Sequence, residues 1–160
     1  MIRVYVETTV PSYLTAHLSR DLQMAARQQA SQDWWDVAPK HCELFISELV
    51  WDEISGGDAE AAVRRQDSVR DLPRLVFVPE MIPLIEAYES ELGLPEKARP
   101  DIVHVAFAVA YEIDYLVTWN CRHIANPETI ERLFEINLRL SAFNPRITTP
   151  DVMLELWAEE

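Results

Sequence analysis

The sequence predicts an α/β fold in which a central, mostly parallel sheet of four to five strands lies between two layers of helices. Short runs rich in β-branched and aromatic residues alternate with helical segments of about ten residues or more, as in βαβ units. These runs are largely apolar, as strands are when helices cover both faces of a parallel sheet. A length of 160 residues fits one domain, so residues 1–160 are expected to form a single domain.

The first half of the chain shows this alternation most clearly. Ser47 is placed to cap the helix after the second strand, and Gly56 and Gly57 end that helix. Asp58 is placed to cap the next helix, and Pro79 closes the third strand. The strands expected here are residues 3–6, 43–47 and 74–78, and the helices are residues 11–18, 21–37, 48–55 and 59–71.

The second half continues the pattern after a further helix. Pro83 falls in the first turn of that helix, where a proline is tolerated. Pro100 and Asp101 open a strongly apolar helix, and Pro127 begins another. The strands expected here are residues 114–118 and, as a fifth, 146–148; the helices are residues 80–92 and 101–111, one from 127 onward and one opened by residues 150–151.

The charge balance limits how the protein could bind nucleic acid. There are 27 acidic and 14 basic residues, a net charge of −13, so the surface as a whole repels phosphate. A nucleic-acid partner would have to meet a local basic patch or a metal-loaded site. Arg64, Arg65, Arg70 and Arg74 form the densest basic cluster. It fits either a solvated helix face paired with neighbouring aspartates or a phosphate clamp.

Cysteine usage and hydropathy favour a cytoplasmic protein. Cys42 and Cys121 are isolated and form no CxxC pair, as expected of reduced thiols. The first residues lack the pattern of a secretory signal. The apolar stretch Val103–Tyr111 is too short to span a bilayer, so no membrane contact is expected.

Polar residues that follow the predicted strands mark the expected functional edge of the sheet. In open α/β sheets, ligands bind beyond the carboxyl ends of the strands, near the point where the strand order reverses. Glu7 follows the first strand, Glu53 lies on the helix after the second, and Asp101 begins the helix that leads to the fourth. Three carboxylates gathered there would repel one another unless a cation neutralised them. An all-oxygen set suits Mg²⁺ or Mn²⁺.

Each of these residues also has a purely structural interpretation. Asp101 could be a helix cap, Glu53 a surface charge and Asn120 a turn residue. His104, three residues after Asp101, could be a hydrogen-bonded core histidine. No His/Cys set has zinc spacing, and the three glycines form neither a dinucleotide nor a P-loop motif. A GxSxG nucleophile elbow is also absent.

Four segments, in this order, carry the residues of the expected site: Val4–Thr9, Ile46–Ile54 with Gly56 soon after, Asp101–Ala106 and Leu116–His123. Together they resemble the motifs of PIN-domain proteins of the kind found as VapC-type toxins. The resemblance covers essentially the whole chain. The Glu-Thr-Thr opening and the Thr-Trp-Asn-Cys-Arg-His run point to a stand-alone subfamily. The resemblance implies a PIN-like three-layer α/β/α fold.

The same resemblance implies an Mg²⁺- or Mn²⁺-dependent endoribonuclease, with RNA as its substrate. Carried over to this sequence, the metal-binding and catalytic positions are Glu7, Glu53, Asp101 and Asn120. The residues expected to support them are Thr9, Thr118, His104 and His123. Many relatives are toxins that dimerise and pair with a small antitoxin, so a homodimer and an antitoxin partner are also implied.

Two departures from the family pattern motivate other functions. Glu7 stands where relatives usually have aspartate, and Asn120 and His123 stand where acids are often found. Fewer negative charges weaken divalent-metal binding. One alternative is therefore a catalytically weakened PIN module that binds RNA or a protein without cleaving. A third possible function, besides the ribonuclease and this module, is that of a small-molecule phosphohydrolase on a similar sheet.

A homodimer is also expected from apolar, tryptophan-bearing segments. Trp34 and Trp35 on one helix, and Leu154, Leu156 and Trp157 near the end of the chain, could supply self-contacts. The alternative is that these side chains complete the core of one chain.

Overall fold

Five parallel strands form one sheet in the order β3-β2-β1-β4-β5. The computed structural model describes residues 1–158. The strands are β1 (Ile2–Val6), β2 (Cys42–Ser47), β3 (Arg74–Leu75), β4 (Tyr115–Val117) and β5 (Arg146–Thr148). The predicted parallel sheet is therefore confirmed, with all five expected strands present.

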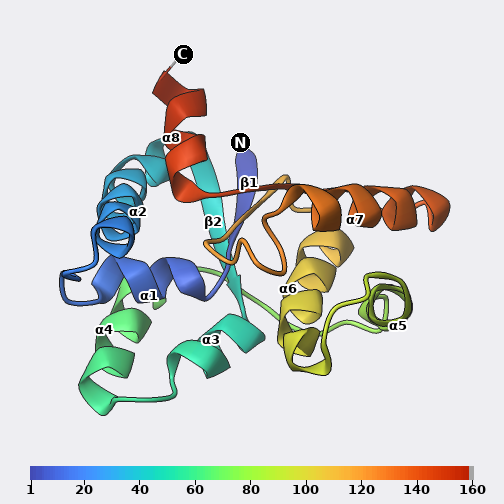
Figure 1. Cartoon of the computed structure of the whole chain (residues 1–160), viewed down its shortest axis with the longest axis horizontal. Coiled ribbons are helices and arrows are strands. Elements are labelled where there is room, and N and C mark those ends of the chain that lie inside the picture. Colours follow the sequence, from blue (N-terminus) through green and yellow to red (C-terminus); the bar gives the residue numbers. More distant parts are fainter. Residues whose placement is uncertain (159–160) are drawn as a thin grey trace.

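Helices cover both faces of the sheet, which gives the three layers seen in Figure 1. Helices α1, α2, α4 and α8 lie on one side, α5, α6 and α7 lie on the other, and α3 continues directly from the end of β2. The helices are α1 (Thr9–Thr15), α2 (Leu22–His41), α3 (Glu48–Ile54), α4 (Ala59–Val69), α5 (Met81–Glu91), α6 (Arg99–Ala110), α7 (Pro127–Arg139) and α8 (Pro150–Ala158), with a 3₁₀ turn η1 (Glu96–Ala98) before α6.

Side-chain caps fix the starts of several helices where the sequence predicted them. The Ser47 hydroxyl accepts a hydrogen bond from the Val50 backbone N–H at α3, and the Asp58 carboxylate accepts one from Ala61 at α4. Asn126 caps α7 in the same way. These caps satisfy backbone donors that have no partner inside the helix. The cap by Ser47 also fixes the start of α3, the helix that carries Glu53.

The strand order reverses between β1 and β4, at the centre of the sheet. The chain builds β1, β2 and β3 outward in one direction and then returns to add β4 on the other side of β1. Val6 pairs with Val117, so the residues after these two strands are neighbours. This reversal point is where open α/β sheets bind ligands.

Three predicted boundaries are wrong. The third strand was expected over 74–78 but ends at Leu75, because Phe77 turns away and donates its backbone N–H to the Glu48 carboxylate. Helix α1 covers Thr9–Thr15 instead of residues 11–18. Helix α2 continues to His41 and passes through Pro39, since the packing of its buried face outweighs the backbone hydrogen bond that proline removes.

The tryptophans expected at a dimer interface pack within one chain. Trp34 is fully buried, and its ring stacks on Trp157 of α8 with the centroids 6.4 Å apart. Trp157 also stacks on His41 at 4.5 Å. The core interpretation is confirmed for Trp34, whereas Leu156 stays 47% exposed. Homodimer formation itself stays a prediction.

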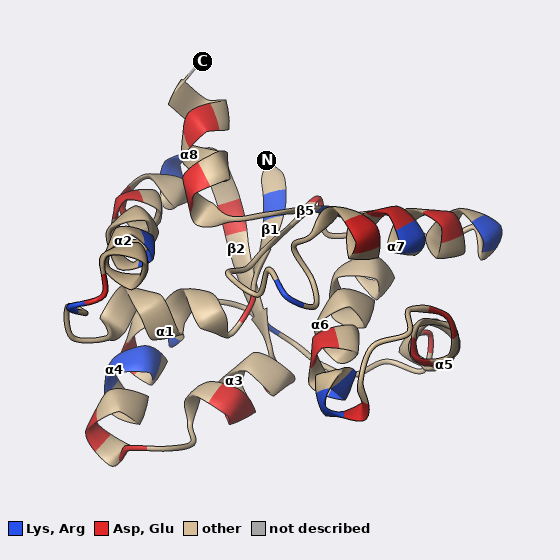
Figure 2. Cartoon of the chain, in the orientation of Figure 1, with Lys and Arg blue, Asp and Glu red and all other residues tan. Residues whose placement is uncertain are grey.

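The arginine cluster serves mainly local contacts. Arg64 donates to the Thr15 carbonyl, and Arg65 donates to the carbonyls of Ile54 and Gly56. Arg70 pairs with Asp67, as the solvated-face interpretation predicted. Figure 2 shows acidic and basic residues spread over most helices, with both signs along α7. In the part of the chain that the structure describes, no helix is long and apolar enough to cross a membrane.

Candidate active site

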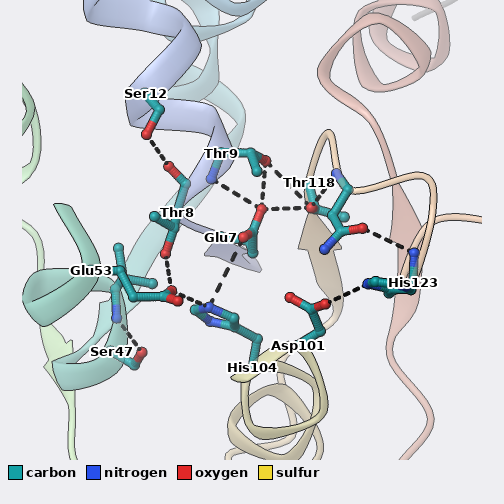
Figure 3. A network of polar contacts seen from close by, with 12 residues as sticks. Glu7, Thr8, Thr9, Ser12, Ser47, Glu53, Asp101, His104, Thr118 and His123 are labelled. Atoms are coloured by element: carbon teal, nitrogen blue, oxygen red, sulfur yellow. Dashed lines mark hydrogen bonds and ion pairs between the residues drawn. The ribbon is translucent and has the colours of Figure 1, made fainter. Parts of the chain in front are cut away.

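The predicted site residues meet at the carboxyl edge of the sheet, beside the reversal point between β1 and β4. Figure 3 shows Glu7, Glu53 and Asp101 arranged around the imidazole of His104. Glu7 follows β1, Glu53 lies on α3, and both Asp101 and His104 belong to α6. Segments that are far apart in the sequence therefore bring three acidic side chains to one place.

Glu7 is almost fully buried, with 3% of its surface exposed, and its Oε1 atom is firmly held. This oxygen accepts hydrogen bonds from the Thr9 backbone N–H at 3.1 Å, from the Thr9 hydroxyl at 2.5 Å and from the Thr118 hydroxyl at 2.6 Å. A buried carboxyl group needs such hydrogen-bond partners. Thr9 and Thr118 thus hold this oxygen of Glu7 in place.

The two threonines are themselves fixed by the loop after β4. The Thr9 hydroxyl oxygen accepts the Trp119 backbone N–H at 2.8 Å, and that of Thr118 accepts the Asn120 N–H at 2.9 Å. Each hydroxyl therefore accepts from the backbone and donates its one proton to Glu7. This arrangement ties the ends of β1 and β4 together through the Glu7 carboxylate.

Glu53 is held by a threonine and a histidine. Its Oε1 atom accepts a hydrogen bond from the Thr8 hydroxyl at 2.6 Å and lies 2.6 Å from Nε2 of His104. Partial burial by itself would raise the pKa of Glu53. The hydrogen bond from His104, the attraction of its imidazole and the Thr8 hydrogen bond outweigh that effect and hold the pKa below its usual value. Glu53 is therefore a carboxylate at neutral pH.

Asp101 lies in the first turn of α6, where the helix dipole favours a negative charge. The helix begins two residues earlier, so Asp101 is not its cap. Its Oδ2 atom lies 2.9 Å from Nδ1 of His123, in the loop after β4. His123 thus supports Asp101, as His104 supports Glu53.

Asn120 mainly shapes the loop. Its side-chain oxygen accepts the His123 backbone N–H at 2.9 Å, and its carbonyl accepts from Ile124 and Ala125. This is the turn role that the sequence left open as an alternative. Because that turn carries His123, Asn120 also sets the position of the histidine beside Asp101.

In each of the three acids, one carboxylate oxygen takes part in hydrogen bonds and the other takes part in none. Oε1 of Glu7, Oε1 of Glu53 and Oδ2 of Asp101 take all the hydrogen bonds. Within residues 1–158, the second oxygen of each acid accepts none, and Oε2 of Glu7 lies 4.0 Å from Nε2 of His104. The leftover oxygens are a donor set suited to a hard divalent cation.

The acids are not gathered as tightly as the ligands of a bound ion. Within the described part of the chain, no three acidic, histidine or cysteine side chains lie close enough together to enclose a metal. The type of donor fits Mg²⁺ or Mn²⁺, although the acids lie too far apart to enclose an ion in this arrangement.

Three residues of this network were not predicted as site residues. Thr8 donates a hydrogen bond to Glu53. Tyr5 contacts His104 directly, and Ser47 contacts Tyr5. Strand alternation could have indicated Tyr5, because it lies on β1 two residues before Glu7 and residues two apart along a strand point to the same face. Ser47 was predicted as a helix cap and lies in the Ile46–Ile54 segment, but it was given no role at the site.

Acidification should expose the contribution of Glu53 to stability. Because its pKa is lowered on folding, the contribution is present above its usual value of 4.5 and is lost as the pH falls through the folded value. We expect the free energy of unfolding, measured with urea between pH 7 and pH 3, to fall more steeply in the wild type than in Glu53→Gln. The exposed Glu86 of α5 provides the control, and Glu86→Gln should keep the wild-type slope. Parallel curves for all three proteins would contradict the prediction.

Comparison with known proteins supports the fold. No protein-family model and no curated protein matches the sequence. Among solved structures, the chain is similar to one in the crystal structure of VapBC2 from Rickettsia felis bound to a DNA fragment from their promoter. The TM-score is 0.58 at 14% identity, over 93% of this chain and 98% of that one. Such a likeness concerns the fold alone, and with the parallel sheet it confirms the predicted PIN-like three-layer α/β/α fold.

Proposed function

We propose that this protein is a divalent-metal-dependent ribonuclease that hydrolyses phosphodiester bonds in RNA. One observation carries the proposal: Glu7, Glu53 and Asp101 meet at the ligand-binding edge of the sheet, each with one oxygen held and one left over. Holding buried or half-buried acids beside one another is unfavourable unless a cation binds them. Their oxygens match the ligands that Mg²⁺ and Mn²⁺ prefer.

In this proposal, Glu7, Glu53 and Asp101 would hold the metal, with Asn120 at the fourth position through its side chain or a water. When bound, the ion would lower the pKa of a coordinated water and stabilise negative charge on the scissile phosphate. Thr9 and Thr118 keep Glu7 oriented through its Oε1 atom. His104 and His123 orient Glu53 and Asp101 in the same manner.

We also propose that the protein acts as the toxin-like member of a pair with a small antitoxin, and that it forms a homodimer. The fold-level likeness to a chain of VapBC2 supports the pairing. A separate antitoxin would let a cell hold a nuclease of this kind inactive. The net charge of −13 favours a partner with a basic binding segment.

The test is RNA cleavage by purified protein with Mn²⁺, with Mg²⁺ and with EDTA, using structured and unstructured RNAs. We expect cleavage with either metal and none with EDTA. Cleavage that persists in EDTA would contradict the metal-dependent mechanism. Turnover of a phosphate monoester without any cleavage of RNA would instead indicate a small-molecule phosphohydrolase.

A module that binds RNA or a protein without cleaving is the second candidate, and one observation favours it. The side-chain oxygen of Asn120 is already engaged in the turn, and Asn120 brings no negative charge to the site. Retention of RNA without cleavage, across all RNAs and both metals, would support this function over the nuclease.

A further inference from the structure

A line of buried polar side chains leads from the start of α3 to Glu53. Tyr5, Ser47 and His104 are each at most 1% exposed. The Tyr5 hydroxyl lies 2.7 Å from the Ser47 hydroxyl and 2.7 Å from Nδ1 of His104. On its other side, Nε2 of His104 lies 2.6 Å from Glu53. The line therefore joins β1, β2 and α6 and ends on one of the candidate metal ligands.

Matching each donor with an acceptor fixes the direction of the hydrogen bonds along this line. Glu53 is a carboxylate and can only accept, so Nε2 of His104 carries a proton. If Nδ1 is unprotonated, it accepts from Tyr5, and Tyr5 accepts from Ser47. The Ser47 oxygen in turn accepts the Val50 backbone N–H at 3.1 Å. Every donor then has an acceptor, from the α3 backbone to Glu53.

The opposite direction leaves a proton without a partner. With Nδ1 protonated, His104 would donate to Tyr5, and Tyr5 would donate to Ser47. The fully buried Ser47 hydroxyl would then face no acceptor within residues 1–158. An unpaired buried donor is unfavourable, so the network favours the imidazole with its proton on Nε2 alone.

Packing alone does not explain the Tyr5 hydroxyl. The ring of Tyr5 stacks on Phe107 of α6, with the centroids 6.4 Å apart, and phenylalanine would serve that contact equally well. Full burial raises the pKa of Tyr5 well above its usual value, so the phenol stays neutral and can donate. A buried hydroxyl needs polar partners, and here they are His104 and Ser47.

We propose that Tyr5, fixed by Ser47, is a positioning residue that holds His104 in the tautomer with its proton on Nε2 and thereby orients Glu53. The structural part of this proposal concerns the metal-free protein. Its effect on catalysis rests on the proposed ribonuclease function. Removal of the Tyr5 hydroxyl should leave Nδ1 of His104 without its hydrogen-bond donor and so loosen the ring and Glu53, while the fold is kept.

The test compares Tyr5→Phe with Tyr88→Phe. Tyr88 is also fully buried, and its hydroxyl donates to Asn137, away from the site. Imidazole ¹⁵N chemical shifts of His104 at one neutral pH report the tautomer directly in the metal-free protein. We expect the Nε2–H form with a hydrogen-bonded Nδ1 in the wild type and in Tyr88→Phe. In Tyr5→Phe, the Nδ1 shift should move toward that of an unprotonated nitrogen without a hydrogen-bond donor. An unchanged Nδ1 shift in Tyr5→Phe would overturn the proposal.

Mn²⁺ binding and kinetics form the second arm. Residues behind a metal ligand typically change affinity by about 10–100-fold, so Tyr5→Phe should weaken Mn²⁺ binding by about 10-fold and lower kcat with little change in KM. Tyr88→Phe should change neither.

A second pair of variants serves if Tyr5→Phe does not fold. The amide N–H of His104→Gln can still reach Glu53, so this variant should retain more Mn²⁺ affinity than His104→Ala. Equal affinities would contradict a positioning role. If the wild type fails to cleave any RNA, the proposed function fails, and the tautomer measurement still decides the structural part.

Discussion

Replacement of Asp101 by asparagine should abolish divalent-metal binding and metal-dependent RNA cleavage. Asparagine keeps the size and one oxygen of the side chain but removes its charge. Because Glu7, Glu53 and Asp101 supply all the negative charge of the proposed site, the variant loses a third of it. We expect cleavage to fall by more than about 100-fold, the upper end for residues that act only behind a metal ligand. Calorimetric titration with Mn²⁺ and cleavage of a labelled RNA provide the two measurements.

The control is Asp151→Asn. Asp151 is also an acidic residue in the first turn of a helix, in this case α8. Loss of a favourable interaction with a helix dipole changes stability by about 0.3–1 kcal/mol, and both variants should share that small effect. Only Asp101→Asn should lose Mn²⁺ binding. A difference between the two variants therefore reports the metal site and not helix stability.

An unchanged Mn²⁺ titration of Asp101→Asn would remove Asp101 from the site. His123 would then be the neighbour to examine, because its Nδ1 atom contacts Asp101. Equal RNA cleavage by the wild type and Asp101→Asn would instead identify a contaminating nuclease.

The location of the site could be predicted from sequence because parallel sheets impose it. Glu7 directly follows an apolar strand, and acids are rare at such positions. Once the strands are recognised as parallel, their carboxyl ends must meet at one edge. The first turn of α6 could be predicted to hold Asp101, since proline and acidic residues are typical of helix starts.

The partners of each acid could not be predicted in the same way. They depend on three-dimensional contacts between residues that are far apart in the sequence, as with Thr8 and Glu53 or Asp101 and His123. Tyr5 looked like an ordinary strand residue, because aromatic residues are common in strands. Its hydroxyl gains significance only when His104 and Ser47 are seen beside it.

Boundary errors have a related cause. The strand-like residues after Leu75 favour a longer β3, yet Phe77 bonds to Glu48 and not to a neighbouring strand. Likewise, Pro39 suggests the end of a helix, yet α2 continues to His41. In both places a tertiary contact outweighs local preference, and local preference is all that a single sequence displays.

Replacement of Glu7 by aspartate should lower both the stability of the protein and the affinity of its metal site. Oε1 of Glu7 accepts three hydrogen bonds whose donors are held in place by the backbone of the loop after β4. Removal of one methylene would draw the carboxylate back by about 1.5 Å, which is half the length of such a bond. We expect Mn²⁺ affinity to fall by about 10–100-fold and stability by about 1–3 kcal/mol, measured by calorimetry and urea unfolding.

Glu7→Gln separates the two effects. Glutamine reaches Thr9 and Thr118 as glutamate does, so its oxygen can accept the same hydrogen bonds while the charge is lost. It should therefore lose metal binding but retain most of the stability that Glu7→Asp loses. If Glu7→Asp instead binds Mn²⁺ as tightly as the wild type, the threonines do not set the position of the carboxylate. Aspartate is the usual acid at this place in proteins that the sequence resembles, so the expected loss would mean that Thr9 and Thr118 have fitted this site to the longer side chain.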